Sequence, residues 1–165
     1  MTLQEAAAQA DAFAQEGAER DLADLRTNWA DELEAAARSQ DFRERAIAFR
    51  AVGQFRWRAK EELLRRGLDD DSPAVRGSAL LSLELLSRDH PSSVNSVRSK
   101  LHTLATGDGN EAVRRLAVLA LKNGSPQRDT VVLLEGLADN DEAEAQLRKT
   151  ASSVAQQLKR RQTKR

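Results

Sequence analysis

Apolar residues recur every three or four positions along most of the chain, with polar residues between them. The first such stripe lies within residues 2–16 and consists of Leu3, Ala6, Ala7, Ala10, Phe13 and Ala14. A second stripe lies within residues 19–38 and consists of Leu22, Leu25, Trp29, Leu33 and Ala36. This spacing places the apolar side chains on one face of a helix. The pattern therefore predicts two amphipathic helices, with Gly17 at or near the end of the first.

Capping signals mark the next helices. Asp41 is followed three positions later by Glu44, a pairing that satisfies the free amides at a helix start. We expect a helix from Asp41 to near Gly53, and another over residues 55–66 that ends at Gly67. In this second helix Trp57, Leu63 and Leu64 are expected to point inward.

Proline and glycine punctuate the second half of the chain. Ser72-Pro73 and Ser125-Pro126 each combine a capping residue with a first-turn proline, and Pro91 opens a further segment. Gly107-Asp-Gly-Asn110 is a turn signal. The predicted helices cover residues 73–87, 91–105, 110–121, 126–137 and 141–158.

A short pattern recurs within these predicted helices: Arg, then Ala three positions later, then a small and an aliphatic residue. The copies are Arg45-Ala48-Ala51-Val52, Arg76-Ala79-Ser82-Leu83, Arg114-Ala117-Ala120-Leu121 and, less regularly, Arg148-Ala151-Val154-Ala155. The segment 133–139 also echoes the segment 63–70. A period of a few tens of residues is typical of stacked helical hairpins, which bury their apolar faces against one another.

These patterns predict an all-α protein that forms one continuous domain. Residues 1–40 form an N-terminal helical cap, residues 41–158 form about four helical hairpins, and residues 159–165 form a frayed basic tail. Aromatic residues make up only 4% of the chain, which favours helices packed through small residues over a sheet.

The order of short helix, Asp-rich turn and Val-Arg-x-x-Ala at the start of a second helix resembles the HEAT-repeat family, in particular its short bacterial form. The best matches are Asp71-Ser-Pro-Ala-Val-Arg76-Gly-Ser-Ala79 and Asn110-Glu-Ala-Val-Arg114-Arg-Leu-Ala117. The resemblance implies a right-handed α-solenoid whose second helices line the concave side, and it implies binding of another macromolecule. The fourth copy departs from the pattern, because Leu147 replaces Val.

In that family the repeated Arg and the turn Asp commonly bond between neighbouring repeats. The resemblance therefore implies structural roles for Arg45, Arg76, Arg114 and Arg148.

The overall charge and the lack of cysteine limit the classes of function. The chain carries 26 basic and 26 acidic residues, so no overall field draws it to nucleic acid or to an anionic membrane. It has no cysteine, hence no disulfide, and neither a signal peptide nor an apolar run of about 20 residues is evident. We expect a cytoplasmic protein that does not associate with membranes.

No combination of residues indicates catalysis. His90 and His102 lack partners at metal-ligand spacing, and Asp69-Asp-Asp71 is interpreted as capping a helix start. Gly107-Asp-Gly109 is a turn and not a dinucleotide-binding motif, and no serine lies in a glycine-flanked elbow. We expect no enzyme activity, no cofactor and no metal site.

Charge is unevenly distributed along the chain. Residues 1–40 carry three basic and nine acidic side chains, whereas residues 41–66 carry eight basic and four acidic ones. The basic side chains of that second segment, with Trp57 among them, could bind phosphates; they are Arg43, Arg50, Arg56, Arg58, Lys60, Arg65 and Arg66. Alternatively they form a solvated face, or pair with the acidic N-terminal helices.

The leading hypothesis is a non-enzymatic protein-interaction module or scaffold that binds a protein or peptide along its second helices. The residues expected to contact the partner are Arg50, Arg56, Trp57, Arg58 and Arg115. The alternative is nucleic-acid binding through the basic segment 43–66. Alkylpurine DNA glycosylases are a HEAT-like group, but they resemble this chain in fold type only. A third possibility is a regulatory scaffold or immunity-type inhibitor whose acidic N-terminal region binds a basic partner.

Overall fold

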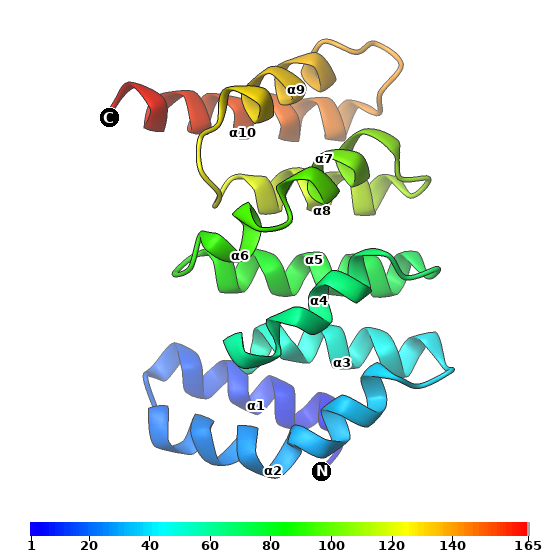
Figure 1. Cartoon of the computed structure of the whole chain (residues 1–165), viewed down its shortest axis with the longest axis vertical. Helices are drawn as coiled ribbons and strands as arrows, with labels where there is room; N and C mark the ends of the chain where they lie inside the picture. The colour runs from blue at the N-terminus through cyan, green and yellow to red at the C-terminus, as the bar shows by residue number, and fades with distance from the viewer. Residues whose placement is uncertain (165) are drawn as a thin grey trace. The chain divides into compact units, whose positions relative to one another are not determined.

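The computed structural model describes residues 1–164, and 77% of the chain is helical. No strand occurs within these residues, which confirms the all-α prediction. The elements are α1 (Leu3–Glu16), α2 (Glu19–Ala37), α3 (Phe42–Gln54), a 3₁₀ turn η1 (Arg58–Lys60), α4 (Glu61–Leu68), α5 (Pro73–Ser87), α6 (Ser92–Asn95), α7 (Arg98–Gly107), α8 (Glu111–Leu121), α9 (Arg128–Ala138) and α10 (Ala145–Thr163) (Figure 1). The chain divides into two compact units, the first covering residues 1–86 and the second beginning at Ser87.

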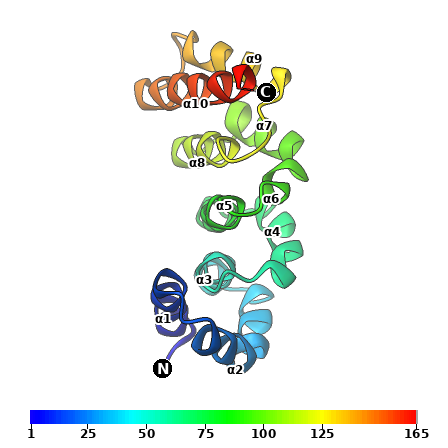
Figure 2. The ribbon, with the colours of Figure 1, turned by 90° about the vertical axis from the view of Figure 1, so that its left-hand side faces the viewer.

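Unit 1 has two layers of helices. Helices α1, α3 and α5 form one layer, and α2 and α4 form the other (Figure 2). Helix α1 packs against both α2 and α3. Its buried face consists of Leu3, Ala6, Ala7 and Ala10, and the three alanines are fully buried. Small side chains on this face let the helix axes approach closely, as expected from the spacing of apolar residues.

Helices α3 and α5 touch at Gly53 and Ser82. The Gly53 amide donates to the Ser82 hydroxyl oxygen at 2.9 Å, and that hydroxyl donates to the carbonyl of Phe49. A Cβ atom on Gly53 would lie 2.6 Å from the Ser82 Cα atom. Ser82 is the small residue of the second copy of the recurring pattern, whereas Gly53 directly follows the first copy.

Unit 2 is also built in two layers. Helices α8 and α10 lie in one layer and α7 and α9 in the other (Figure 2). Helix α10 packs against both α8 and α9, and α7 packs against α8. Asn95 at the end of α6 holds the α8–α9 loop, since its side chain bonds to both the hydroxyl and the amide of Ser125 at 2.9 and 2.8 Å.

The segment after α3 differs from the prediction. We expected a helix over residues 55–66, but the chain first turns at Arg56, which has a left-handed φ of 50°, and α4 begins only at Glu61. Trp57 therefore lies in the connection and is half-buried rather than inward-pointing. Gly67 does not end α4: it is buried within it, where an added Cβ would lie 3.2 Å from the Phe49 ring.

Four other boundaries differ from the prediction. The segment expected as one helix after Pro91 divides into α6 and α7, with Val94 and Val97 both buried beside the break. Helices α9 and α10 begin a few residues later than expected. Helix α10 also extends to Thr163, so most of the expected basic tail is helical; the tail residue Arg165 lies outside the described residues.

Candidate binding surfaces

The Arg56 side chain stabilises the fold and is not a free cation. Its Nη1 atom donates to the Asp11 carboxylate at 2.7 Å and to the carbonyls of Gly53 and Gln54 at 3.0 and 3.2 Å. Arg56 therefore joins the end of α3 to α1. Arg56 was predicted to contact a partner. Its side chain is partly exposed, but its guanidinium is already hydrogen-bonded within the chain.

Trp57, Arg58 and Arg50 lie in the same unit in different settings. The Trp57 ring is tilted against the Phe55 ring with the centroids 5.5 Å apart, and the Lys60 ammonium lies 5.3 Å from the Trp57 centroid. Arg58 is exposed, with its Nε atom 3.8 Å from the Glu61 carboxylate. Arg50 is half-buried on α3. The structure places these side chains around the α3–α4 connection.

Two of the basic side chains predicted as a stripe pair with the acidic N-terminal helices. Arg56 bonds to Asp11 of α1, and Lys60 Nζ lies 2.6 Å from the Glu34 carboxylate of α2. Arg43, Arg65 and Arg66 are exposed. The stripe is therefore divided between cations that hold the N-terminal helices and cations that face solvent.

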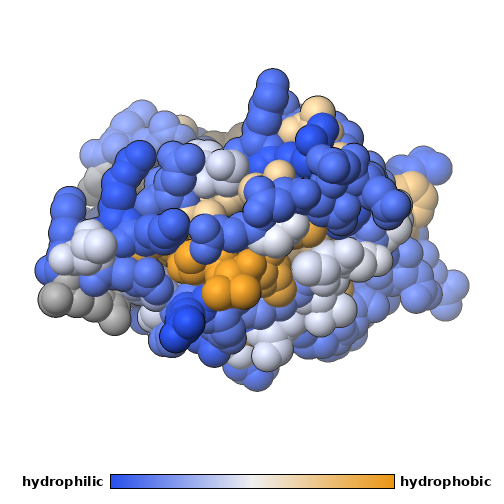
Figure 3. Space-filling model, turned by 90° about the horizontal axis from the view of Figure 1, so that it is seen from above, coloured by the Kyte–Doolittle hydropathy of each residue, from blue (hydrophilic) through white to orange (hydrophobic). Residues whose placement is uncertain are grey.

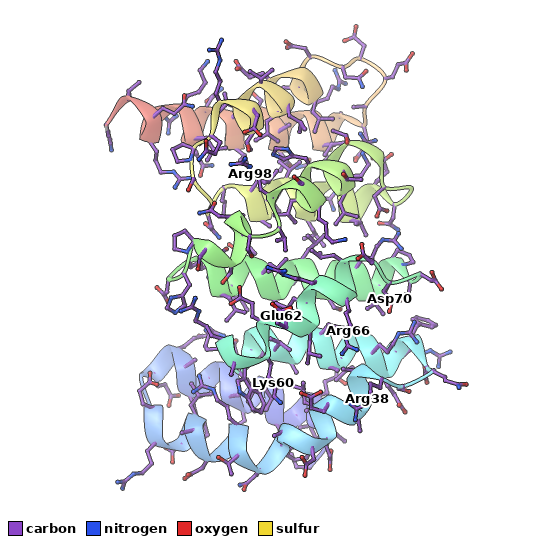
Figure 4. All side chains as sticks on the ribbon, in the orientation of Figure 1. Arg38, Lys60, Glu62, Arg66, Asp70 and Arg98 are labelled. Carbon is purple, nitrogen blue, oxygen red and sulfur yellow. The ribbon has the colours of Figure 1, made fainter. Side chains whose placement is uncertain are left out.

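Glu34 is the centre of a group of cations between α2 and α4. Arg38 lies 3.4 Å from Glu34, and Figure 4 shows Arg38, Lys60 and Arg66 in this region. The hydrogen bond from Lys60 lowers the pKa of Glu34 against the opposing effect of burial, and the charges of Lys60, Arg38 and Arg66 lower it further. Three cations surround one carboxylate, so this surface is locally positive.

Arg45 makes the kind of bond that the family resemblance implies for it. Its guanidinium forms a two-pronged pair with Asp70, at 2.9 and 3.0 Å, and donates to the carbonyl oxygens of Ser39 and Gln40. Asp70 lies in the turn between α4 and α5, so the bond links the start of α3 to the next helix pair. Arg45 is therefore a structural residue.

A groove of about 490 Å³ opens between α1, α2 and α3. The residues that line it are Thr2, Leu3, Gln4, Glu32, Ala35, Ala36, Glu44 and Ile47. Its apolar part includes Leu3 and Ile47, while Glu32 and Glu44 are exposed carboxylates on two different walls. None of the eight lining residues is basic.

Capped helix starts hold two walls of the groove. Thr2 and Glu5 form a reciprocal capping box at the start of α1, with bonds of 3.1 and 2.8 Å. Asp41 accepts from the Arg43 amide at 2.9 Å and caps α3. Of these caps only that of Asp41 was predicted from the sequence, and the expected return bond from Glu44 is not formed. The groove itself was not predicted, because its lining comes from three helices separated in the chain.

In unit 2, Arg115 is half-buried on α8, with its Nη1 atom 4.0 Å from the Glu144 carboxylate. His102 does not face a metal-like cluster: its Nε2 atom lies 2.9 Å from the Thr130 hydroxyl. Burial lowers the pKa of His102; the charge of Asp129 opposes this shift and that of Arg98 adds to it. The His102–Thr130 and Arg115–Glu144 contacts both join helices or loops within unit 2.

The surface of α9 and α10 carries a small apolar area and a polar hollow. Figure 3 shows an apolar patch surrounded by hydrophilic residues on this side, and Val132 of α9 is 58% exposed. A hollow of about 190 Å³ between the two helices is lined by Glu135, Ala138, Asp139, Ser152, Ala155, Gln156 and Lys159. Lys159 and Glu135 form an ion pair across this hollow at 3.3 Å. Its lining is therefore more polar than that of the groove between α1, α2 and α3.

Within residues 1–164, no group of three or more His, Asp or Glu side chains is arranged to hold a metal ion. The helices of that part of the chain are too short or too polar to cross a membrane. No protein-family model, curated protein or solved structure matches this chain.

Proposed function

We propose that this chain is a non-enzymatic helical-repeat protein that binds a protein or peptide partner, as an interaction module or scaffold. The observation that carries the proposal is the coincidence of the recurring Arg-x-x-Ala pattern with recurring helices, α3, α5, α8 and α10. Repeats of this kind present extended helical surfaces, which commonly bind other macromolecules.

The proposal includes the finer architecture, a right-handed α-solenoid of about four HEAT-like hairpins. Two contacts support it. Arg45 of α3 bonds to Asp70 in the turn of the next helix pair, and α3 lies against α5 at Gly53 and Ser82. The same order of a first helix, an acidic turn and a second helix beginning near an Arg recurs at Arg114.

Nucleic-acid binding is the second candidate, and the cations around Glu34 favour it. Arg38 is 62% exposed at its side chain, and Arg66 is also exposed. Against it, Arg56 and Lys60 are engaged with Asp11 and Glu34, which reduces the charge available to phosphates. We therefore prefer a protein partner.

An affinity capture from a lysate of the source organism, run with and without nuclease, tests the proposal. We expect a stoichiometric protein that remains bound after nuclease treatment. An Arg38→Glu/Arg66→Glu variant serves as the matched bait, and it should capture the same protein. A different result would contradict a protein partner and support nucleic-acid binding: the wild-type bait recovers nucleic acid, the Arg38→Glu/Arg66→Glu bait does not, and all captured proteins are lost after nuclease treatment.

A further inference from the structure

We propose that the groove between α1, α2 and α3 binds a short amphipathic peptide segment in which a Lys or Arg lies next to a large apolar side chain. The inference rests on the proposed protein-binding function and names the chemistry of the partner and the place where it binds. Unit 1 contains the whole groove, so the inference depends on this unit alone.

The apolar part of the groove determines the first half of the partner's chemistry. The larger aliphatic side chains of the lining are Leu3, which is mostly buried at the start of α1, and Ile47, which is half-buried on α3. Besides Glu32, α2 contributes only the short side chains of Ala35 and Ala36 to the lining, and these leave space where the three helices meet. Its volume of about 490 Å³ lies within the range of roughly 300–1,000 Å³ found for ligand-binding pockets.

The charge at the rim determines the second half. Glu32 on α2 and Glu44 on α3 are both exposed, and neither has a basic neighbour in the lining. A cationic side chain placed between them would interact favourably with both, and complementary charge of this kind selects partners and speeds association.

Acidic side chains outnumber basic ones in the segment that includes α1 and α2, two walls of the groove. Residues 1–40 contain nine acidic and only three basic side chains. Of those three, Arg26 donates hydrogen bonds to the carbonyl oxygens of Phe55 and Arg56, and Arg38 donates one to the Glu34 carboxylate. On α3 the neighbouring cation, Arg43, lies over the Phe42 ring at 5.5 Å.

The same carboxylates decide against the other class of macromolecule. A phosphate backbone entering the groove would meet Glu32 and Glu44 with no lining cation to offset the repulsion. A peptide with a basic and an apolar side chain complements both the carboxylates at the rim and the aliphatic lining, whereas the phosphates of a nucleic acid complement neither.

A phage-displayed library of random 12-residue peptides, selected on the full-length chain, tests the inference. Enriched peptides are then synthesised with a fluorophore, and their affinity is measured by fluorescence polarisation. We expect the enriched sequences to place Lys or Arg next to Leu, Ile, Phe or Trp. A Glu32→Lys/Glu44→Lys variant should weaken their binding about tenfold or more, the equivalent of about 1.4 kcal/mol.

Two further variants separate the groove from a general charge effect. Glu16→Lys/Asp24→Lys makes the same change in net charge at exposed positions of α1 and α2 outside the lining, and it should leave the affinity within about threefold of wild type. Ala35→Trp adds bulk at an exposed lining position and, like Glu32→Lys/Glu44→Lys, should weaken binding about tenfold or more. Circular dichroism confirms that each variant is folded.

Three results would overturn the inference. Enriched peptides could lack basic residues, their affinity could be unchanged by the groove variants, or no peptide could be enriched. Dimerisation of the wild-type chain that Glu32→Lys/Glu44→Lys abolishes, measured by sedimentation, would also overturn it by assigning the groove to a second copy. The lysate capture judges the proposed function separately, so a partner that binds equally well to the groove variant would leave that function intact.

Discussion

At the scale of the residue, Gly53 shows how closely the helices of unit 1 are packed. A methyl group on Gly53 would lie 2.6 Å from the backbone of Ser82, which cannot rotate away as a side chain could. We expect Gly53→Ala to lower the free energy of unfolding by about 1–3 kcal/mol, the usual cost of overpacking a core. Urea denaturation measures this.

The matched control for that substitution is Gly136→Ala. Gly136 lies within α9, and an added Cβ would meet no atom within 4 Å. Because alanine favours the helix more than glycine does, this variant should be more stable by about 0.5–1 kcal/mol. If both variants lost stability equally, close packing at Gly53 would not be the cause.

Asp70 predicts a dependence of stability on pH. Burial acts to raise the pKa of Asp70, but the hydrogen bonds from Arg45 and from the Ser72 amide, with the charges of Arg45 and Arg76, lower it below its usual value. A carboxyl whose pKa is lower in the folded state stabilises the fold above its unfolded pKa of about 3.9, and this stabilisation is lost as the pH falls through the folded value.

We therefore expect Asp70→Asn to lower the melting temperature at pH 7 and to have a much smaller effect once the pH falls below the lowered pKa of Asp70, where the wild-type carboxyl is also protonated. Thermal denaturation followed by circular dichroism from pH 2 to 7 measures both effects. A difference between variant and wild type that stayed constant over this range would show that the Asp70 charge does not stabilise the fold.

The position of Trp57 in the connection after α3 changes the expected cost of truncating its side chain. If this side chain were in the core, its truncation to alanine would cost about 3–5 kcal/mol. Because the ring is half-buried and packs mainly against Phe55 and Lys60, we expect Trp57→Ala to cost less than that range. Chemical denaturation gives the value, and a loss within the full range would indicate that the ring is more buried than described.

At the scale of the element, helix α1 is held against the other helices of unit 1 by a face of alanines and by the ion pair between Asp11 and Arg56. Ala10 is fully buried in this face, whereas Ala12 on the same helix is exposed. We expect Ala10→Leu to destabilise the docking of α1 by about 1–3 kcal/mol. Ala12→Leu, which adds the same atoms on the solvent side, should change stability little.

Limited proteolysis and thermal denaturation distinguish the two leucine variants. Ala10→Leu should expose sites in the first 20 residues to cleavage, and it should also weaken any peptide bound between α1, α2 and α3. Equal resistance of the two variants to protease would mean that the alanine face is not what holds α1 in place.

At the scale of the whole molecule, charge is balanced in total but not along the chain. The formal net charge is zero at pH 7, and a protein without net charge has the least electrostatic repulsion between its copies. We expect solubility to be lowest near pH 7 and to rise on either side. Static light scattering at pH 5, 7 and 9 measures this, and a minimum at another pH would contradict the expectation.

The sequence by itself determined the helices whose ends are marked by short-range signals. Asp41, Pro73 and Asn110 lie at the starts of α3, α5 and α8, because a cap or a first-turn proline acts within a few residues of itself. The apolar stripes likewise identified most of the buried face of α1, but in α2 only Leu22 and Leu33 of the stripe are buried. For Arg45 a structural role was only what the resemblance to HEAT repeats implied; in the structure its partner Asp70 lies 25 positions away.

Only the tertiary structure decided the features that depend on distant parts of the chain. Arg56 takes a left-handed backbone conformation where its side chain reaches Asp11, and Gly67 is buried in α4 because Phe49 and Ala79 lie against it. The acid-rimmed groove arises where residues near positions 3, 35 and 45 meet. No local signal specifies such meetings, since they depend on how closely side chains far apart in the sequence allow the helices to approach.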